Sequence, residues 1–192
     1  DNNLMSGIYR SCNTYFANTY RRILDQSGES LEEGMNIWNK HLKSFGLGNY
    51  LGYDLPVGKK GFVPDTDYYN FWYKKGGWKS ATVVSNAIGQ GELLTTPIQM
   101  ANFTAAIANR GYYFQPHFLK SVGKESLAKV YEKKITSIDS IHFEPVIEGM
   151  FQVVERGTAR VAERKGIEIC GKPGTVETTM KIEGANTPLT DP

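Results

Sequence analysis

The most constrained stretch of the chain is PIQMANFTAAIANRG, residues 97–111, in which a proline opens and a glycine closes a run with helical periodicity. Proline is favoured in the first turn of a helix, where its missing N–H needs no partner, and glycine commonly ends helices. Apolar side chains at Ile98, Ala101, Ala105 and Ala108 fall on one face. Because these side chains are small, we expect this face to pack closely against another helix.

Further elements are expected on both sides of this helix. Residues 12–24 carry apolar and aromatic groups at helical spacing, whereas the opening DNNLMSGIYR has no recognisable cap. Ser30 and Glu33 form a capping box that predicts a helix to about Phe45. The remaining expectations are a long loop over 49–78, an extended segment over 112–122, strands over 128–131 and 167–170, a helix from Pro145 and a helical turn over 157–163.

Composition limits the class of protein. The chain has 192 residues, 40% of them hydrophobic and 22% charged, with a net charge of +2. This length supports one domain with its own core, and no repeat, low-complexity segment or linker divides it. No basic run with interleaved aromatic residues is present, so nucleic acid is not an expected partner. No apolar stretch approaches the roughly 18 residues that a membrane-spanning helix needs. We expect the chain to be a fragment of something longer.

Metal and cofactor sites are not expected. The histidines His41, His117 and His142 are scattered, and none has a partner at metal-ligand spacing. Cys12 and Cys170 are expected to be buried thiols, with a disulfide between them as the alternative. The aromatic cluster over 68–78 predicts either a packed surface loop or a surface that contacts carbohydrate or peptide.

The stretch GIEICGKP, residues 166–173, partly matches a phosphate-binding loop. Gly166, Gly171 and Lys172 have the required spacing. However, the interior Ile-Glu-Ile-Cys favours a strand over a turn, and Pro173 stands where the loop needs a hydroxyl. The residues that follow are β-branched and unfavourable in a helix. The pattern therefore argues against a phosphate-binding loop.

The same stretch fits an acyl-transfer site better when it is combined with Ser11-Cys12-Asn13. An S-x-N motif places a hydroxyl and an amide on one loop that faces a cleft. A K-x-G motif on an edge strand, here Lys172-Pro173-Gly174, places an ammonium group opposite them. Gly174 leaves space for a substrate to lie against the backbone. Each motif alone is weak evidence. The order of the two motifs and their separation along the chain support an acyl-transfer site.

A third segment gives the chain a family resemblance. The stretch GQGELLTTPIQMA, residues 89–101, strongly resembles the GQG-x-L-x-x-TP-x-Q-x-A segment of penicillin-binding transpeptidases. SCNTYF, GYDLP (52–56) and the turn at 157–159 also match. Over nearly its whole length the chain resembles the transpeptidase domain of class B penicillin-binding proteins, of the penicillin-binding protein 2 type. The resemblance implies an α+β fold of the penicillin-binding protein and serine β-lactamase kind, an antiparallel sheet with helices, incomplete here. Residues 1–192 would be a single partial transpeptidase domain.

The activity that the resemblance implies is that of a peptidoglycan D,D-transpeptidase, which cross-links stem peptides through an acyl-serine intermediate and is acylated by β-lactams. In the family's pattern Ser11 relays a proton, Asn13 holds the bound peptide and Lys172 supplies positive potential. Gly174 and Thr175 contact the substrate, and the Thr175 N–H forms half of the oxyanion hole. The implied partners are stem peptides, β-lactam antibiotics and membrane proteins of cell elongation. The implied location is the periplasmic face of the bacterial inner membrane, through an N-terminal anchor absent from this chain.

The sequence departs from this pattern in three ways. The family's nucleophile lies in an S-x-x-K motif before S-x-N, and the only matches here, Ser121 to Lys124 and Ser126 to Lys129, come after it. We therefore expect the nucleophile not to be in this chain. Pro173 stands where the family has threonine, which removes an N–H and a hydroxyl. The family's final strands would also be missing after the lysine strand, and an exposed edge favours pairing between chains. We expect this chain alone to be inactive, and dimeric or partly disordered over 165–192.

Two other functions compete with a catalytic one. The first is a non-catalytic scaffold or binding module with the penicillin-binding fold, for which Pro173 would be the mark. The second is a soluble β-lactamase or penicillin sensor, against which the GQG and TP segment argues because it resembles class B transpeptidases.

Overall fold

The computed structural model describes residues 3–52, 54–126, 131–174, 179–180 and 189–190. Its α-helices are α1 (Leu4–Tyr9), α2 (Asn13–Gln26), α3 (Leu31–Ser44), α4 (Thr66–Tyr73), α5 (Pro97–Ala108) and α6 (Glu144–Glu155). Its short 3-10 helices are η1 (Val84–Ile88), η2 (Ser140–His142) and η3 (Arg160–Ala162). Its strands are β1 (Tyr112–Phe114), β2 (Ser121–Val122), β3 (Glu125–Ser126), β4 (Lys133–Ile135), β5 (Thr179–Met180) and β6 (Leu189–Thr190).

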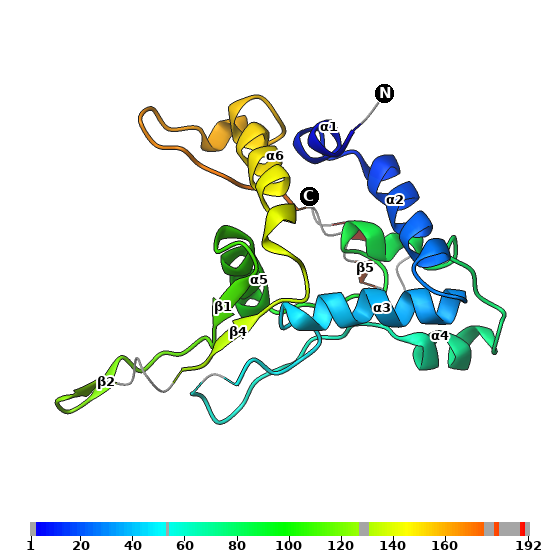
Figure 1. Ribbon diagram of the computed structural model, residues 1–192, viewed down its shortest axis with the longest axis horizontal. Coiled ribbons are helices and arrows are strands. Elements are labelled where there is room, and N and C mark those ends of the chain that lie inside the picture. Colours follow the sequence, from blue (N-terminus) through cyan, green and yellow to red (C-terminus); the bar gives the residue numbers. More distant parts are fainter. Residues whose placement is uncertain (1–2, 53, 127–130, 175–178, 181–188, 191–192) are drawn as a thin grey trace.

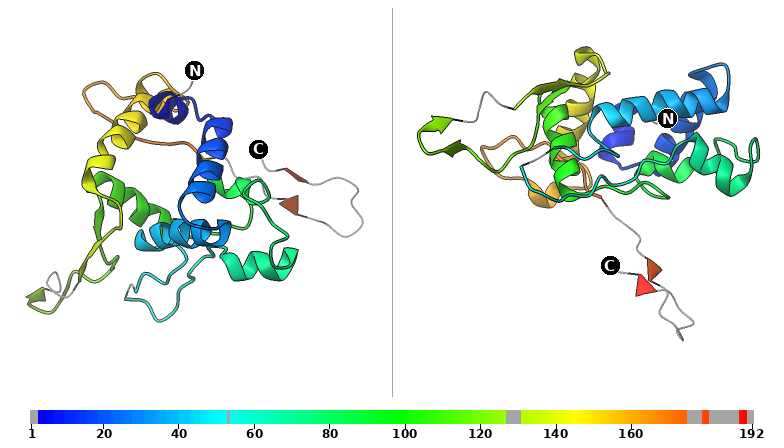
Figure 2. Two further views of the ribbon diagram at one scale, coloured as in Figure 1. Left: turned by 45° about the vertical axis from the view of Figure 1, so that its right-hand side comes forward. Right: turned by 90° about the horizontal axis from the view of Figure 1, so that it is seen from below.

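Helices α1, α2, α3, α5 and α6 follow one another around a ring, with α1 packed on α6 and α2 leading to α3, and α4 lies beside α3 on the outside of the ring (Figure 1; Figure 2, left). The described strands pair antiparallel as β1 with β4, β2 with β3 and β5 with β6. Among the described residues, no helix is long and apolar enough to cross a membrane.

A first hydrophobic core lies between α2, α3, α4 and η1. Its buried side chains are Tyr20, Leu24, Met35, Tyr69, Trp78 and Val83. The two long helices approach closely here, because a Cβ atom added at Gly34 would lie 2.0 Å from the carbonyl oxygen of Leu24. A larger residue at position 34 would therefore force the helices apart.

The predicted helix over 12–24 is confirmed as α2, and the Ser30 cap as the start of α3. The Ser30 hydroxyl accepts from the Glu33 amide at 3.2 Å, while the Glu33 carboxylate accepts from the Glu29 amide at 2.7 Å. The expectation of no cap in the opening residues is wrong. Asn3 and Ser6 form a reciprocal capping box that starts α1, a pairing that differs from the S/T and E/Q pattern used for prediction.

The predicted loop over 49–78 is wrong in part, because α4 lies inside it. Asp65 caps this helix by accepting from the Tyr68 amide at 2.9 Å. The helix has 8 residues, too few to establish a periodic pattern, and it is stabilised by burial of Tyr69 in the first core. In the aromatic cluster Trp78 is buried as well, whereas Phe71 and Trp72 are exposed.

The predicted helix over 97–111 is confirmed as α5, but its predicted packing face is wrong. Ala101, Ala105 and Ala108 are exposed, whereas Gln99 and Asn102 are buried. The Gln99 side-chain amide donates to the carbonyl oxygens of Gly46, Asn49 and Lys60 at 3.2, 3.0 and 2.9 Å. The Asn102 amide donates to the Phe45 carbonyl at 2.9 Å. These amides turn inward because buried carbonyl groups need donors.

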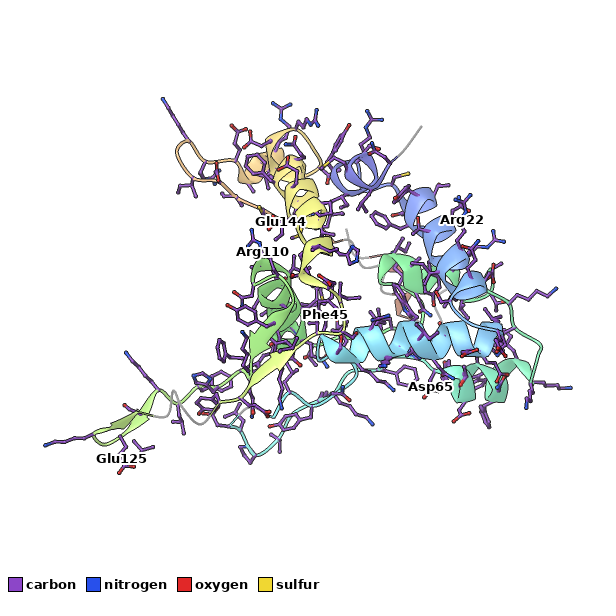
Figure 3. All side chains as sticks on the ribbon, viewed as in Figure 1. Arg22, Phe45, Asp65, Arg110, Glu125 and Glu144 are labelled. Atoms are coloured by element: carbon purple, nitrogen blue, oxygen red, sulfur yellow. The ribbon has the colours of Figure 1, made fainter. Side chains whose placement is uncertain are left out.

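A second hydrophobic core joins α5 to β1 and to the start of α6. It contains the buried side chains of Phe45, Ala106, Tyr113 and Phe143. At its edge the Arg110 guanidinium forms an ion pair with the Glu144 carboxylate, which links the end of α5 to the first turn of α6 (Figure 3). The predicted helix from Pro145 is thereby confirmed within one residue.

The strand predictions are less accurate. Only β1 and β2 occupy the segment predicted as extended over 112–122. Of the strand predicted over 128–131, residues 128–130 lie outside the described residues, and β1 pairs instead with β4, with Tyr112 opposite Ile135. The strand predicted over 167–170 is wrong: no strand is formed there, and the Gly171 amide donates to the Met150 carbonyl at 3.1 Å. A strand requires a paired neighbour, and none of the described strands lies beside this segment.

The cysteine prediction is also wrong. No disulfide joins Cys12 and Cys170, but Cys12 is only half-buried and Cys170 is exposed. Cys170 lies in a segment that none of the described strands covers.

A carboxylate holds the loop after α3 against the segment that follows β1. The Asp54 side chain accepts from the amides of Phe118 and Leu119 at 2.8 and 2.7 Å. Next to it the His117 ring stacks on Tyr131, with ring centroids 3.6 Å apart. Partial desolvation raises the pKa of Asp54, but these two amides, its own amide and the His117 charge lower the pKa more, so that it lies below its usual value of 3.8.

The contact between the Asp54 carboxylate and the amides of Phe118 and Leu119 should depend on pH. Because the pKa of Asp54 is lower in the folded state, its stabilising effect is complete above the unfolded value and is lost as the pH falls through the folded pKa. We expect protection of the Phe118 and Leu119 amides from hydrogen exchange, corrected for intrinsic rates, to fall between about pH 5 and pH 2. In Asp54→Asn the protection should be lower and independent of pH over this range. Wild-type protection that stays constant would contradict the account.

Candidate active site

The site begins at the turn between α1 and α2, which ends α1 with a left-handed residue. The Cys12 amide donates to the Gly7 carbonyl at 2.9 Å, and the Ser11 amide donates to the Ile8 carbonyl at 3.1 Å. These are the two hydrogen bonds of a Schellman motif, in which glycine usually occupies the left-handed position. Here Ser11 occupies it with φ of 52°. A left-handed conformation costs roughly 1–2 kcal/mol for a residue with a side chain, so the hydroxyl is held at this point against a backbone preference.

The loop that follows α6 provides the first partner of this hydroxyl. Thr158 Oγ1 lies 3.1 Å from Ser11 Oγ, and the Thr158 amide donates to the Tyr9 carbonyl at 3.3 Å. Gly157 makes the approach possible, because a Cβ atom there would lie 2.4 Å from the Tyr9 carbonyl oxygen. The end of α1 and the end of α6 are therefore fixed against each other beside Ser11.

Lys172 provides the second partner. Its Nζ donates to Ser11 Oγ at 2.6 Å and to the carbonyl oxygen of Pro173 at 3.1 Å. Although the side chain remains partly exposed, desolvation lowers the pKa of Lys172 below the usual 10.5. Since Ser11 Oγ accepts from Lys172, its own proton is available to Thr158. The three groups form a line along which protons can move between an amine and two hydroxyls.

These groups open onto a pocket of about 420 Å³. Its polar side is formed by Ser11, Asn13 and Lys172, and its apolar side by Phe16, Ala87, Ile88, Phe103 and Pro173. Asn13 is the first residue of α2, so the helix places its amide directly beyond the Ser11 turn. An amine, a hydroxyl and an amide that face one partly apolar pocket can bind a peptide backbone and transfer a proton to or from it.

The structure brings together most of the residues predicted from the two motifs. Ser11 and Lys172 are in direct contact, and Asn13 and Pro173 line the same pocket. Gly174 follows, and a Cβ atom added there would meet no described atom within 4 Å. Thr175 lies outside the described residues. Lys172 is not on a strand, which corrects the expected edge-strand placement.

The two internal S-x-x-K matches are placed elsewhere. Ser121 lies in β2 and pairs with Ser126 in β3, within a hairpin that extends away from the helices (Figure 1). Lys129 lies outside the described residues. Neither serine is placed beside Ser11.

Sequence reasoning missed Thr158 and the apolar wall of the pocket. The match of the turn at 157–159 was a signal for Thr158, but its role depends on the contact with Ser11, 147 positions away. Phe103 and Ile88 carried no separate signal, because an apolar residue that lines a pocket has the same pattern as one that packs in a core.

Comparisons with known proteins show the family of the chain. Residues 1–188 match the family described as "Penicillin binding protein transpeptidase domain". The peptidoglycan D,D-transpeptidase MrdA of Acinetobacter baumannii is 28% identical over 189 residues, which cover 95% of this chain and 26% of that protein. The chain thus spans about a quarter of the length of this relative.

Solved structures give the same result for the fold. The penicillin-binding protein 2 of Pseudomonas aeruginosa, in complex with WCK 5153, superposes with a TM-score of 0.66 at 28% identity, over 83% of this chain and 34% of that chain. The complex of penicillin-binding protein 2 and MreC from Helicobacter pylori gives a TM-score of 0.69 at 26% identity, over 95% of this chain and 31% of that chain. The expected α+β transpeptidase fold, incomplete in this chain, is confirmed.

The strain at Ser11 predicts a stability difference between two variants that lack the hydroxyl. Ser11→Gly and Ser11→Ala both lose the bonds to Lys172 and Thr158, but only glycine adopts the left-handed turn without strain. After the entropy of glycine is allowed for, we expect Ser11→Gly to be more stable than Ser11→Ala by about 1 kcal/mol in urea unfolding. Equal stabilities, or a more stable alanine variant, would contradict the left-handed turn.

Proposed function

Since the chain belongs to the penicillin binding protein transpeptidase domain family, we propose that it is a single partial domain of a peptidoglycan D,D-transpeptidase. The observation that carries the proposal is the 2.6 Å hydrogen bond from Lys172 to Ser11, across 161 positions of the chain. It joins the S-x-N and K-x-G motifs, which is the arrangement that serine acyl transfer of this kind requires. The substrates are stem peptides that end in D-alanyl-D-alanine, and β-lactams acylate the same site.

In this proposal the attacking serine is supplied by an S-x-x-K segment outside residues 1–192. Its hydroxyl proton passes to the relay that contains Ser11, its oxygen forms a bond to the penultimate D-alanyl carbonyl carbon, and the bond to the terminal D-alanine nitrogen breaks. Ser11, hydrogen-bonded to Lys172 and Thr158, delivers the proton that this leaving nitrogen needs. An amine of a neighbouring strand then forms a bond to the acyl carbon, the bond from this carbon to the serine oxygen breaks, and the proton of the amine passes through the same relay to the serine oxygen. At the end of the second half of the reaction, the attacking serine and the relay through Ser11 have regained the protons that they gave up in the first half.

The other residues bind and orient the peptide. Asn13, on the first turn of α2, hydrogen-bonds the bound backbone from the wall of the pocket. The ammonium of Lys172 attracts the substrate carboxylate. Gly174 leaves the space in which the peptide lies, and the Thr175 amide supplies an oxyanion donor.

We further propose that the protein acts at the periplasmic face of the inner membrane through an N-terminal anchor, and that it binds membrane proteins of the cell-elongation machinery. The complex of penicillin-binding protein 2 with MreC from Helicobacter pylori supports a partner of this kind.

A non-catalytic scaffold is the second candidate, and Pro173 is the observation that favours it. Proline offers neither the N–H nor the hydroxyl that threonine would present to a carboxylate. Its carbonyl oxygen, moreover, accepts from Lys172 at 3.1 Å. The scaffold would keep the fold and the Lys172 contact but would not form an acyl-enzyme.

Acylation by benzylpenicillin tests the proposed function. In the intact protein that carries these residues, we expect one covalent adduct by mass spectrometry. The variant Lys172→Met should form it about 10²–10³ times more slowly, because the proton relay is broken. The matched control is Lys165→Met, which removes an exposed lysine outside the pocket and should acylate at the wild-type rate.

Two results would contradict the proposal in different ways. A wild-type acylation rate in Lys172→Met would remove Lys172 from the mechanism. No adduct in the intact wild-type protein would favour the scaffold.

A further inference from the structure

Two residues of the apolar wall of the active-site pocket, Ala87 and Ile88, belong to the short 3-10 helix η1. A 3-10 helix has poorer hydrogen-bond geometry than an α-helix, so a single short piece depends on its side chains for its position. This helix lies beside α2 and ends at Gly89, which has φ of 73°. The position of the wall therefore depends on the side chains that η1 buries.

The inner side of η1 is formed by Val83, directly before the helix, and by Asn86 within it. Both are buried, and side chains three residues apart eclipse in a 3-10 helix, so they lie on the same side. Val83 belongs to the first hydrophobic core, and an apolar contact has no preferred direction. Asn86 is polar and only 7% exposed. Because a hydrogen bond does have a direction, the bond of the Asn86 amide restricts how η1 can rotate.

A chain of two hydrogen bonds joins Asn86 to α4 and to the segment that follows η1. The Asn86 side-chain amide donates to the Tyr69 hydroxyl at 2.7 Å, and this hydroxyl donates to the Glu92 carboxylate at 3.0 Å. An ionised carboxylate only accepts, so Tyr69 must donate to Glu92 and accept from the NH₂ group of Asn86. The carboxylate thus fixes the direction of both hydrogen bonds.

The phenols near this chain keep their protons. Burial raises the pKa of Tyr69, the Asn86 amide lowers it, and the Glu92 carboxylate raises it, so that it lies above its usual value of 10.0. Burial likewise raises the pKa of Tyr20, on α2, to about 12. The Tyr69 hydroxyl is therefore a donor at physiological pH.

The GQG turn, residues 89–91, brings Glu92 back toward η1. Both of its glycines have left-handed φ angles, 73° and 72°, and the amide of its central residue donates to the Ser85 carbonyl at 3.1 Å. A Cβ atom added at Gly91 would lie 3.1 Å from the Ser85 Cβ and 3.2 Å from Asn86 Oδ1. The turn therefore packs directly against η1, and glycine leaves the space for this contact.

We propose that the Asn86–Tyr69–Glu92 chain positions the apolar wall of the active-site pocket, and that Tyr69 is a positioning residue whose hydroxyl determines how tightly a ligand binds before acylation. The inference rests on the proposed function, because it takes this pocket as the site of acylation. Tyr69 and Glu92 do not line the pocket. They act through Asn86, which directly precedes the two wall residues of η1.

The experiment measures the rate of acylation of the intact protein over a range of benzylpenicillin concentrations. The half-saturating concentration reports binding before acylation, and the limiting rate reports the chemical step. In Tyr69→Phe, which removes only the hydroxyl, we expect the half-saturating concentration to rise about fivefold. The limiting rate should stay within about twofold of the wild-type rate, because the relay through Ser11 and Lys172 is unchanged. A loss of folded protein would lower the amount of adduct and leave both quantities unchanged.

Variants of the carboxylate test the chain at its other end. Glu92→Gln keeps an oxygen that can accept from Tyr69, so its half-saturating concentration should lie within about twofold of the wild-type value. Glu92→Met removes the acceptor and should reproduce the shift of Tyr69→Phe. The matched control is Tyr68→Phe, because Tyr68 precedes Tyr69 on α4 and its ring packs on Phe62. This control should behave as the wild type.

A double-mutant cycle tests whether Tyr69 acts through the wall. Ile88→Ala removes the larger of the two wall side chains on η1. In this background the further change Tyr69→Phe should alter the half-saturating concentration by less than about twofold. Two effects that multiply would show that Tyr69 acts elsewhere, and would overturn the inference.

The outcomes separate the inference from the proposed function. A wild type that is acylated, together with unchanged half-saturating concentrations in Tyr69→Phe and Glu92→Met, would overturn the inference and leave the proposed function intact. A slower limiting rate at an unchanged half-saturating concentration would also overturn it. Failure of the intact wild type to form an adduct would overturn the proposed function and the inference together.

Discussion

The hydrogen bond from Lys172 to Ser11 is the contact on which the site depends. It requires the left-handed turn after α1, the close approach of the Gly157 loop to the end of α1, and the bond that holds Gly171 to α6. Each of these features restricts the backbone and so positions Ser11 or Lys172. The left-handed turn at Ser11 does so at a cost in conformational energy. Such strain is expected where a hydroxyl must be presented to a substrate, because a relaxed turn would favour glycine.

The rest of the structure supports this contact from a distance. Buried amides on α5 donate to carbonyl groups of the segment after α3, between Phe45 and Lys60, and hold this segment against α5. Fully satisfied buried networks of this kind make one arrangement more favourable than its alternatives. The apolar wall of the pocket, with Phe16 from α2 and Phe103 from α5, therefore joins two helices that the cores have already positioned.

The sequence predicted those features that depend on local chemistry. The Ser30 and Pro97 signals placed two helix starts, and the two short motifs contain Ser11, Asn13 and Lys172, which line one pocket in the structure. It failed where distant segments decide the outcome. Gln99 and Asn102 are buried because carbonyl groups more than 35 positions away need donors. The left-handed turn at Ser11 and the contact of Thr158 with Ser11 depend on the packing of α1 against α6. The segment before Lys172 has strand-forming residues, but residue preference does not supply a neighbouring strand.

A double-mutant cycle on Ser11 and Lys172 tests most directly whether the two residues act as one unit. The rate of acylation by benzylpenicillin would be measured for Ser11→Ala, Lys172→Met and the double variant of the intact protein. If the two groups share one proton path, the double variant should be no slower than the slower single variant, within about threefold. Effects that multiply in the double variant would show that Ser11 and Lys172 act independently, and would contradict the account.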